Sequence, residues 1–279
     1  MNQKQAYQLF DKMIAAATKQ LMDFTLAAVL DTEHKADKSV VTACDQRIDD
    51  VLSGLARDAG LQVVSEEGLH VLGTVRSGNY MTIDPIDGTL GYIEYVNYAL
   101  EHGGIETFLQ HDLGAASDFC LLLGIVEDNQ PRFGAVYNFM TKEKIFIDAR
   151  DKAGLVRENN VRNYTQAHAV YVDQRPGDHV EQKLIQMPDA TIIKQAALGL
   201  KSAYTILNPH ESAVTVHRVQ VAGLWDIMPA AVAAQAFGGT VYDDQGCELV
   251  CNEYIILPGT GATIVKGDRF AFVLDELKK

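Results

Sequence analysis

The sequence predicts a layered α/β protein, and three features of the chain lead to this prediction. The first 24 residues have helical periodicity, residues 119–148 contain three strand-like runs, and residues 169–219 alternate strand-like and helical segments. Apolar residues form 47% of the 279 residues, which is enough for a large core. Because no apolar run approaches the roughly 18 residues of a membrane span, we expect a soluble globular protein.

The N-terminal elements follow from apolar spacing and capping residues. In the first helix, charged residues such as Asp11 interrupt the apolar positions, which excludes an export signal. Residues 31–39 are polar and predict a loop, and a second helix follows with Thr42 as its N-cap and Gly60 at its end. Residues 61–65 then resemble a short buried strand.

The remaining elements divide the chain into two packed halves. We expect an α+β half over residues 1–155 and an α/β half over residues 156–279. The first half contains a strand at 80–83 and an antiparallel meander of strands at 119–126, 132–137 and 144–148. The second half contains strands at 169–172, 191–194 and 214–219 and helices at 179–186 and 198–207.

Charge and cysteine usage restrict the partners and the compartment. A formal charge of −13 argues against nucleic-acid polymers and membranes as partners, because Lys and Arg clusters hold both. A phosphorylated small metabolite requires cations to reverse the sign of an acidic pocket. The four cysteines are Cys44, Cys120, Cys247 and Cys251. Because no two of them form a Cys-x-x-Cys pair, we expect reduced thiols and a cytoplasmic protein.

The most informative stretch runs from Asp84 to Thr89, directly after the strand-like residues 80–83. Asp84 and Asp87 provide the hard oxygen ligands that Mg²⁺ prefers, and the intervening Pro85 stiffens the segment. Gly88 allows a phosphate to approach the main chain, and Thr89 adds a hydroxyl. The stretch therefore predicts a phosphate held by metal ions.

Structural roles compete with these functional ones. The residues from Asp87 to Thr89 could simply turn the chain and cap a helix. Asp226 is predicted at a helix start with Pro229 in the first turn, so Asp226 could be a simple N-cap. Asp45 suits the first turn of a helix on electrostatic grounds alone. The two-aspartate motif of haloacid-dehalogenase-type phosphatases does not fit, because its aspartates are separated by one residue.

The segment Leu90–Asp118 has no clear period and carries five acidic residues and two histidines. Its position after the Asp-Gly-Thr turn suggests a lid over the site. A solvated surface loop explains the same composition, because the histidines lack the helical spacing of a metal site.

Four separated motifs together resemble one known superfamily. In chain order they are Val41–Asp45, Ser65–Glu67, Asp84–Thr89, and Trp225–Asp226 with Gly238–Gly239. This set, over residues 35–239, is similar to the lithium-sensitive, metal-dependent phosphatases that include inositol monophosphatases and 3′(2′),5′-bisphosphate nucleotidases. The resemblance implies a layered αβαβα sandwich of the sugar-phosphatase type, phosphomonoester hydrolysis and a homodimer.

The resemblance also implies a metal-ligand set in which Mg²⁺ is the cofactor, with two or three ions. Glu66, Asp84 and the carbonyl of Ile86 would bind one ion. Asp84, Asp87 and Asp226 would bind a second, so that Asp84 bridges both. Most of these ligands belong to the N-terminal half, and the C-terminal half would close the cleft through Asp226.

The same resemblance assigns the catalytic residues as Asp45, Thr89 and Glu66, with Thr89, oriented by Asp45, positioning the attacking water. The backbone N–H groups of Gly88 and Thr89 would hold phosphate oxygens, and Asp226 would also face the substrate.

Two features favour the nucleotidases within the superfamily. Residues 35–42 resemble the corresponding nucleotidase segment, and Ser65 precedes the glutamate pair where inositol phosphatases more often have Gly. Lys201 resembles a nucleotidase lysine near the substrate, although an exposed helix lysine is an equal interpretation. The expected substrate is 3′-phosphoadenosine 5′-phosphate, hydrolysed to the 5′-monophosphate and phosphate. Inositol monophosphate is the alternative, followed by a sugar bisphosphate or a non-catalytic phosphate-ligand binding protein.

Overall fold

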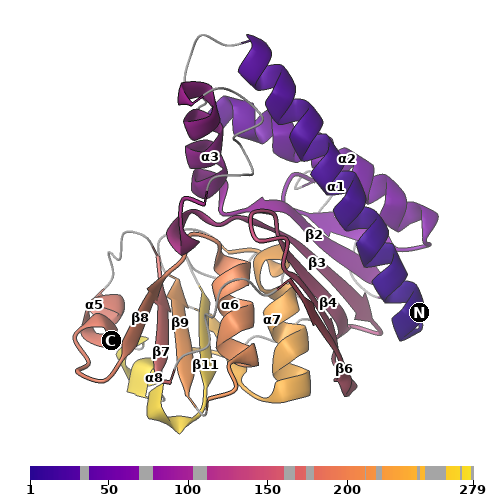
Figure 1. The fold of residues 1–279 in the computed structure, drawn as a ribbon. Coiled ribbons are helices and arrows are strands. Elements are labelled where there is room, and N and C mark those ends of the chain that lie inside the picture. Colours follow the sequence, from indigo (N-terminus) through magenta and orange to yellow (C-terminus); the bar gives the residue numbers. More distant parts are fainter. Residues whose placement is uncertain are drawn as a thin grey trace.

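The computed structural model describes residues 1–31, 38–68, 78–102, 112–159, 167–173, 179–210, 212–217, 222–243, 246–248, 262–270 and 272–277. For residues 26–31 and 38–42 it describes the backbone alone. Two β-sheets and three sets of helices form the layers of the molecule, as Figure 1 shows.

The first sheet is six-stranded and antiparallel except at one edge. Its strand order follows the sequence, and only the β1–β2 pair is parallel. The strands are β1 (Gln62–Ser65), β2 (Tyr80–Asp87), β3 (Cys120–Glu127), β4 (Gln130–Asn138), β5 (Lys144–Asp148) and β6 (Asp151–Glu158). Asp128 and Asn129 both have positive φ, which is the backbone of a tight two-residue hairpin between β3 and β4.

The second sheet has five strands in the order β10-β11-β9-β7-β8. Strand β7 pairs in parallel with β8 and β9, whereas β11 pairs antiparallel with β9 and β10. The strands are β7 (Ala169–Val172), β8 (Thr191–Lys194), β9 (Ala213–His217), β10 (Thr240–Asp243) and β11 (Ala262–Lys266).

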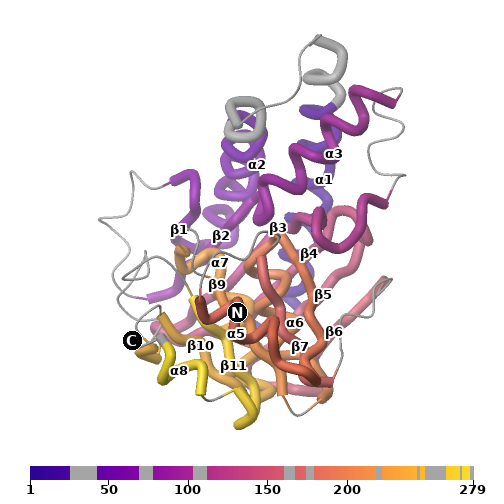
Figure 2. The backbone as a smooth tube through the Cα atoms, turned by 90° about the vertical axis from the view of Figure 1, so that its left-hand side faces the viewer, coloured from indigo at the N-terminus to yellow at the C-terminus, as the bar shows by residue number. Residues whose placement is uncertain are grey.

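Helices cover both faces of the first sheet. Helices α1 (Gln3–Asp31), α2 (Lys38–Asp58) and α3 (Thr89–Glu101) lie together on its outer side, as the turned view in Figure 2 shows. Helices α6 (Leu198–Leu207) and α7 (Leu224–Phe237) lie between the two sheets (Figure 1). Helices α5 (His179–Ile185) and α8 (Phe272–Leu277) pack on the far side of the second sheet. The predicted αβαβα layering is therefore confirmed.

The alternation of side chains along β3 explains why the first sheet is apolar on both faces. Leu121 and Leu123 belong to the core under α1 and α2, whereas Leu122 and Cys120 belong to the core beneath α6 and α7. A strand buried on both faces reads as a continuous apolar run, as Cys120–Val126 does. This arrangement gives β2 and β3 one face toward the middle helices, and the acidic residues described below lie on that face.

Several sequence predictions require correction. Helix α2 begins at Lys38, so Thr42 lies inside the helix and is not its N-cap. Residues 89–101 of the expected lid form helix α3, and residues 103–111 lie outside the described part. Strand β2 continues through Asp87, so both aspartates belong to the strand itself. The sequence prediction also missed β6, β10 and β11, and it extended β9 to residue 219, although residues 218–221 lie outside the described part.

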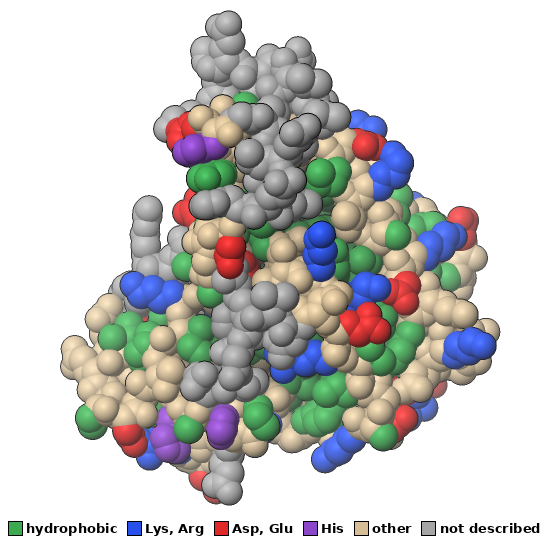
Figure 3. Space-filling view, in the orientation of Figure 1, with side chains coloured by type: hydrophobic (Ala, Val, Ile, Leu, Met, Phe, Trp, Pro, Cys, Tyr) green, Lys and Arg blue, Asp and Glu red, His purple; other side chains and the backbone are tan. Residues whose placement is uncertain are grey.

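The division of the chain at residues 155/156 stays a prediction, and strand β6 runs across that boundary. Among the described helices, none combines the length and apolarity needed to cross a bilayer. On the face shown in Figure 3, Lys and Arg side chains are interspersed with Asp and Glu side chains.

Candidate functional site

A β-bulge brings Asp84 and Asp87 to the same face of the first sheet. Asp84 pairs with Leu122 and Asp87 with Cys120, so three residue steps along β2 correspond to two along β3. In a regular strand, residues three apart point to opposite faces. The extra residue of a bulge shifts the alternation of side chains between the two faces by one position, so that two residues three apart point to the same face. Both carboxylates therefore face the middle helices, as Leu122 and Cys120 do.

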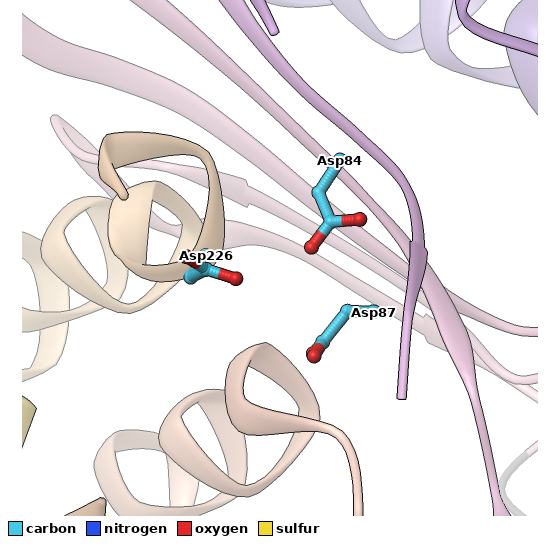
Figure 4. Close-up of side chains that lie close together, drawn as sticks. All are labelled: Asp84, Asp87 and Asp226. Carbon is cyan, nitrogen blue, oxygen red and sulfur yellow. The ribbon is translucent and has the colours of Figure 1, made fainter. Parts of the chain in front are cut away.

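Asp226 reaches the same space from helix α7. The helix begins at Leu224, and a carboxylate oxygen of Asp226 accepts the backbone N–H of the N-cap residue Gly223. The helix start was predicted correctly, but Pro229 lies in the second turn, not the first. Asp226 thus stabilises the helix start with one oxygen, and its carboxylate faces β2 (Figure 4).

The three carboxylates form one compact group. Asp84, Asp87 and Asp226 each offer an oxygen, and these oxygens all lie within 4.8 Å of one another. Figure 4 shows the three side chains pointing into a common space between β2 and the middle helices. Oδ1 of Asp84 accepts the N–H of Ile86 at 3.1 Å, whereas its Oδ2 is buried without a hydrogen-bond partner in the described chain. An orphaned carboxylate oxygen among two other carboxylates fits a divalent cation, which prefers such oxygens.

Burial and mutual repulsion oppose ionisation of this group. Burial raises the pKa of Asp84 and of Asp226 well above the usual carboxyl range, and the charges of Asp87 and Glu66 raise it further. A bound cation would reverse this effect, because an adjacent positive charge favours the ionised form.

Helix α6 holds Asp87 through its N-terminus. The N–H groups of Leu198 and Gly199 donate to the two oxygens of Asp87 at 3.0 and 2.6 Å. Burial raises the pKa of Asp87, and these two hydrogen bonds oppose the shift. The helix can come this close because position 199 is glycine: a Cβ there would lie 2.2 Å from Leu122 and 2.9 Å from the carbonyl oxygen of Asp226.

A third helix begins at the same place. Gly88 has φ +90° and caps α3, and a Cβ on it would lie 3.1 Å from the carbonyl oxygen of Asp118. Its left-handed backbone turns the chain from β2 into the helix, so Thr89 becomes the first helical residue. The Thr89 hydroxyl donates to the carbonyl of Ile86 at 3.4 Å.

Glu66 and Asp45 lie beside the three-carboxylate group. Glu66 follows β1, and its N–H donates to the carbonyl of Ile83 on β2 at 3.2 Å. Burial first, and then the charges of Glu67 and Asp87, raise the pKa of Glu66 to about 7. Oδ1 of Asp45 is buried and has no hydrogen-bond partner in the described chain. The sequence thus placed all five carboxylates in one region, and the structure groups three of them tightly.

The structure overturns one of the two interpretations of Lys201, the exposed helix lysine. Its side chain is fully buried in α6 and forms an ion pair with Asp173, so it is not an exposed helix lysine. His217 joins the pair, with Nδ1 at 3.0 Å from Oδ2 of Asp173. Lys201 and His217 are lesser causes that lower the pKa of Asp87 against the effect of burial.

Sequence reasoning missed two features of the site. The N–H groups that hold Asp87 carry no sequence signal except the glycine at position 199. The Cys120 thiol, which donates to Oδ2 of Asp87 at 3.6 Å, was expected only to be reduced. Both depend on contacts between distant segments, 112 and 33 residues apart, which spacing alone does not reveal.

Comparison with known proteins gives a family match over most of the chain. The sequence profile of the inositol monophosphatase family matches residues 3–264. The fructose-1,6-bisphosphatase/inositol-1-monophosphatase of Methanocaldococcus jannaschii is 22% identical over 226 residues, which cover 79% of this chain and 77% of that protein.

Solved structures show the same fold. Inositol monophosphatase II of Staphylococcus aureus MSSA476 has a TM-score of 0.66 at 16% identity, covering 98% of this chain and 93% of that one. A dual-specific IMPase/NADP phosphatase bound with D-inositol-1-phosphate has a TM-score of 0.67 at 17% identity, covering 99% of this chain and 95% of that one.

Proposed function

This chain belongs to the inositol monophosphatase family of metal-dependent phosphatases, and we propose that it hydrolyses a small phosphomonoester with the three-carboxylate group as its metal site. The observation that carries the proposal is the convergence of Asp84, Asp87 and Asp226 within 4.8 Å, with a buried oxygen of Asp84 that has no hydrogen-bond partner among the described residues.

The proposed ligand set extends this group by two residues. Glu66, Asp84 and the carbonyl of Ile86 would hold one Mg²⁺, and Asp84, Asp87 and Asp226 a second. Bound there, the ions would supply Lewis acidity at the phosphoryl group and lower the pKa of the attacking water. Asp84 would serve both ions, a role that fits an oxygen without a hydrogen-bond partner in the part of the chain that the structure describes.

The start of α3 supports the assignment of the phosphate position. A helix N-terminus carries partial positive charge and free N–H groups, which favour bound phosphate. Gly88 and Thr89 stand at this N-terminus, directly after Asp87 in the chain. Thr89 and Asp45 would orient the attacking water. The hydroxyl of Thr89 already donates to the proposed ligand carbonyl of Ile86.

The proposed substrate is a phosphomonoester on a ribose hydroxyl, with 3′-phosphoadenosine 5′-phosphate as the first candidate. Related structures support this class, because SaIMPase-II was crystallised with 2′-AMP and an IMPase/NADP phosphatase with NADP and Ca²⁺. Both ligands carry a phosphate on a ribose 2′ hydroxyl. Inositol monophosphate is the second candidate, because SaIMPase-II was also crystallised with it. Lys201 remains a proposed substrate residue only if its pair with Asp173 opens toward the ligand.

The test is phosphate release from 3′-phosphoadenosine 5′-phosphate, 2′-AMP, NADP, inositol 1-phosphate and fructose 1,6-bisphosphate, each with Mg²⁺ and with EDTA. We expect turnover with Mg²⁺ alone, and the highest kcat/KM for a ribose phosphate. A clear preference for inositol 1-phosphate would overturn the substrate assignment and keep the mechanism. Undiminished turnover in EDTA, or by an Asp84→Asn variant, would overturn the metal assignment.

A further inference from the structure

The first turn of α6 is attached to the second sheet through Lys201. The ammonium group of Lys201 forms an ion pair with Asp173, which directly follows β7. Asp173 also contacts His217, the last residue of β9, with 3.0 Å between Oδ2 and Nδ1. The carbonyl of Lys201 accepts the hydroxyl of Thr215 on β9 at 3.2 Å. The side chain and the main chain of Lys201 thus fix this turn to two neighbouring parallel strands.

The same turn of α6 holds Asp87. Leu198 and Gly199, the first two helical residues, donate their N–H groups to the two oxygens of Asp87 at 3.0 and 2.6 Å. The N–H of Lys201 closes the turn on the carbonyl of Ala197 at 3.2 Å. Because such bonds hold a helical turn together as one unit, a shift of Lys201 would also move the two N–H groups that Asp87 accepts.

The burial of the ion pair indicates a role in fixing position. The side chain of Lys201 is 0% exposed and that of Asp173 is 13% exposed. Moving two charges out of water costs about as much free energy as their attraction returns, so a buried ion pair adds little stability over an apolar contact of similar volume. Its bonds are directional, however, and they fix the groups that they join. We therefore expect the effect of the pair in the placement of the first turn of α6.

We propose that Lys201, Asp173 and His217 are positioning residues that hold the start of α6, so that its two N–H groups orient Asp87 as a metal ligand. This inference rests on the proposed function in one respect, the assignment of Asp87 to the metal site. In that assignment Asp87 belongs to the ligand set of one ion only. Loss of the three-residue anchor should therefore weaken one ion and spare the other, because hydrogen bonds to a ligating carboxylate set its orientation.

The test uses one double variant and one matched control. Lys201→Met with Asp173→Asn removes the anchor and leaves no partner charge buried and unpaired. Lys266→Met is the control, because the Lys266 ammonium donates to the carbonyl of Ile206 at 2.7 Å and so fixes the opposite end of the same helix. His217→Leu keeps the ion pair and is a milder change at the anchor, so it provides the same measurements if the double variant does not fold.

Amide hydrogen exchange in the metal-free full-length protein reports the placement of the turn directly. By NMR, the amide protons of Leu198 and Gly199 should exchange at least tenfold faster in the double variant than in the wild type, relative to those of β4, which report opening of the whole protein. In Lys266→Met the two protons should keep their relative rates. Unchanged relative rates in the anchor variants would overturn the proposal, and would mean that the bonds of residues 195 and 196 to residues 116–118 hold the turn.

Metal binding is the second readout. Mn²⁺ takes carboxylate oxygens as Mg²⁺ does, and electron paramagnetic resonance counts the free ion. One Mn²⁺ ion should bind at least tenfold more weakly to the double variant than to the wild type, whereas Lys266→Met should keep the wild-type affinities. Charge alone predicts little change, because the double substitution removes one positive and one negative charge.

The two readouts separate this inference from the proposed function. A wild type that binds no Mn²⁺ would overturn the proposed metal site, and faster exchange at the start of α6 would still support the anchor of Asp87. Equal Mn²⁺ affinities in the wild type and the double variant, or equal weakening of every ion, would overturn the inference and leave the phosphatase function standing.

Discussion

Replacing Asp84 by Asn should stabilise the metal-free protein while it removes activity. Asp84 is buried among carboxylates whose oxygens lie within 4.8 Å of its own. Two unit charges 4.8 Å apart repel by about 3.5 kcal/mol at an effective dielectric constant near 20, and by about 1 kcal/mol in water. Because the pKa of Asp84 is raised, a bound proton relieves part of this repulsion.

We therefore expect Asp84→Asn to add about 1–3 kcal/mol to the free energy of unfolding without metal, which is about 2–6 °C in melting temperature for a chain of this size. Asn keeps the oxygen that accepts the Ile86 N–H, and its amide can donate to a neighbouring carboxylate. In contrast, Mg²⁺ at a hundredfold excess over its Kd should stabilise the wild type by about 2.7 kcal/mol, and the variant much less.

The assay is thermal unfolding with EDTA and with increasing Mg²⁺, next to phosphate release. Asp148→Asn is the matched control, because Asp148 is equally buried in the same sheet but is paired with Arg132. That variant should lose stability by a similar amount with and without metal. If Asp84→Asn instead lowers the metal-free melting temperature as Asp148→Asn does, the carboxylates do not repel one another and the metal-site reasoning is refuted.

Three further predictions concern pH, the start of α3 and the buried lysine. Burial raises the pKa of Glu66 from its ordinary 4.5 to about 7, so the folded protein binds a proton that the unfolded chain has lost. The free energy of unfolding without metal should therefore fall as pH rises from about 5 to 8, and saturating Mg²⁺ should flatten this slope. A free energy of unfolding that rises with pH would contradict the assignment. Gly88→Ala should lower the free energy of unfolding by about 1–2 kcal/mol and lower kcat/KM at least tenfold. Gly60→Ala is the control, because Gly60 also has positive φ but open space for a Cβ, and it should lower stability alone. Equal kinetics in the two variants would contradict a phosphate site at α3. Lys201→Met should lower the free energy of unfolding by about 3–5 kcal/mol, because it leaves the charge of Asp173 unpaired, and adding Asp173→Asn should restore part of the loss. Unchanged stability with a higher KM for ribose phosphates would instead support direct substrate contact.

The sequence predicted the carboxylates, and the structure explains how they meet. Asp84 and Asp87 could be assigned from one short motif, because residue type alone restricts the chemistry they perform. Their common orientation could not be assigned, since a bulge is a relation between β2 and β3, and the register of β3 is set by residues beyond position 120. Residues three apart in a regular strand would have pointed to opposite faces.

Two misjudged elements have similar physical causes. Helix α3 buries Tyr92, Tyr95, Val96 and Ala99, which lie at helical spacing, but interspersed acidic and polar residues hide that stripe in the sequence. The alternative that Lys201 is an exposed helix lysine was wrong; it was considered because a lysine is rarely buried. Its burial depends on Asp173 and His217, each supplied by a different strand end, and no local pattern around Lys201 indicates them.

The arrangement of helix starts explains how a chain with a net charge of −13 could hold a phosphate. Three helices begin at the carboxylate group, and each N-terminus acts as about half a positive charge. Helix α6 donates two N–H groups to Asp87, and the start of α7 donates the Gly223 N–H to Asp226, so protein carboxylates occupy both termini. For α3, the carbonyl of Gly88 accepts the N–H groups of residues 91 and 92. The described structure shows no protein carboxylate bound at the start of α3, so an anion placed there would lie directly after Asp84 and Asp87 in the chain.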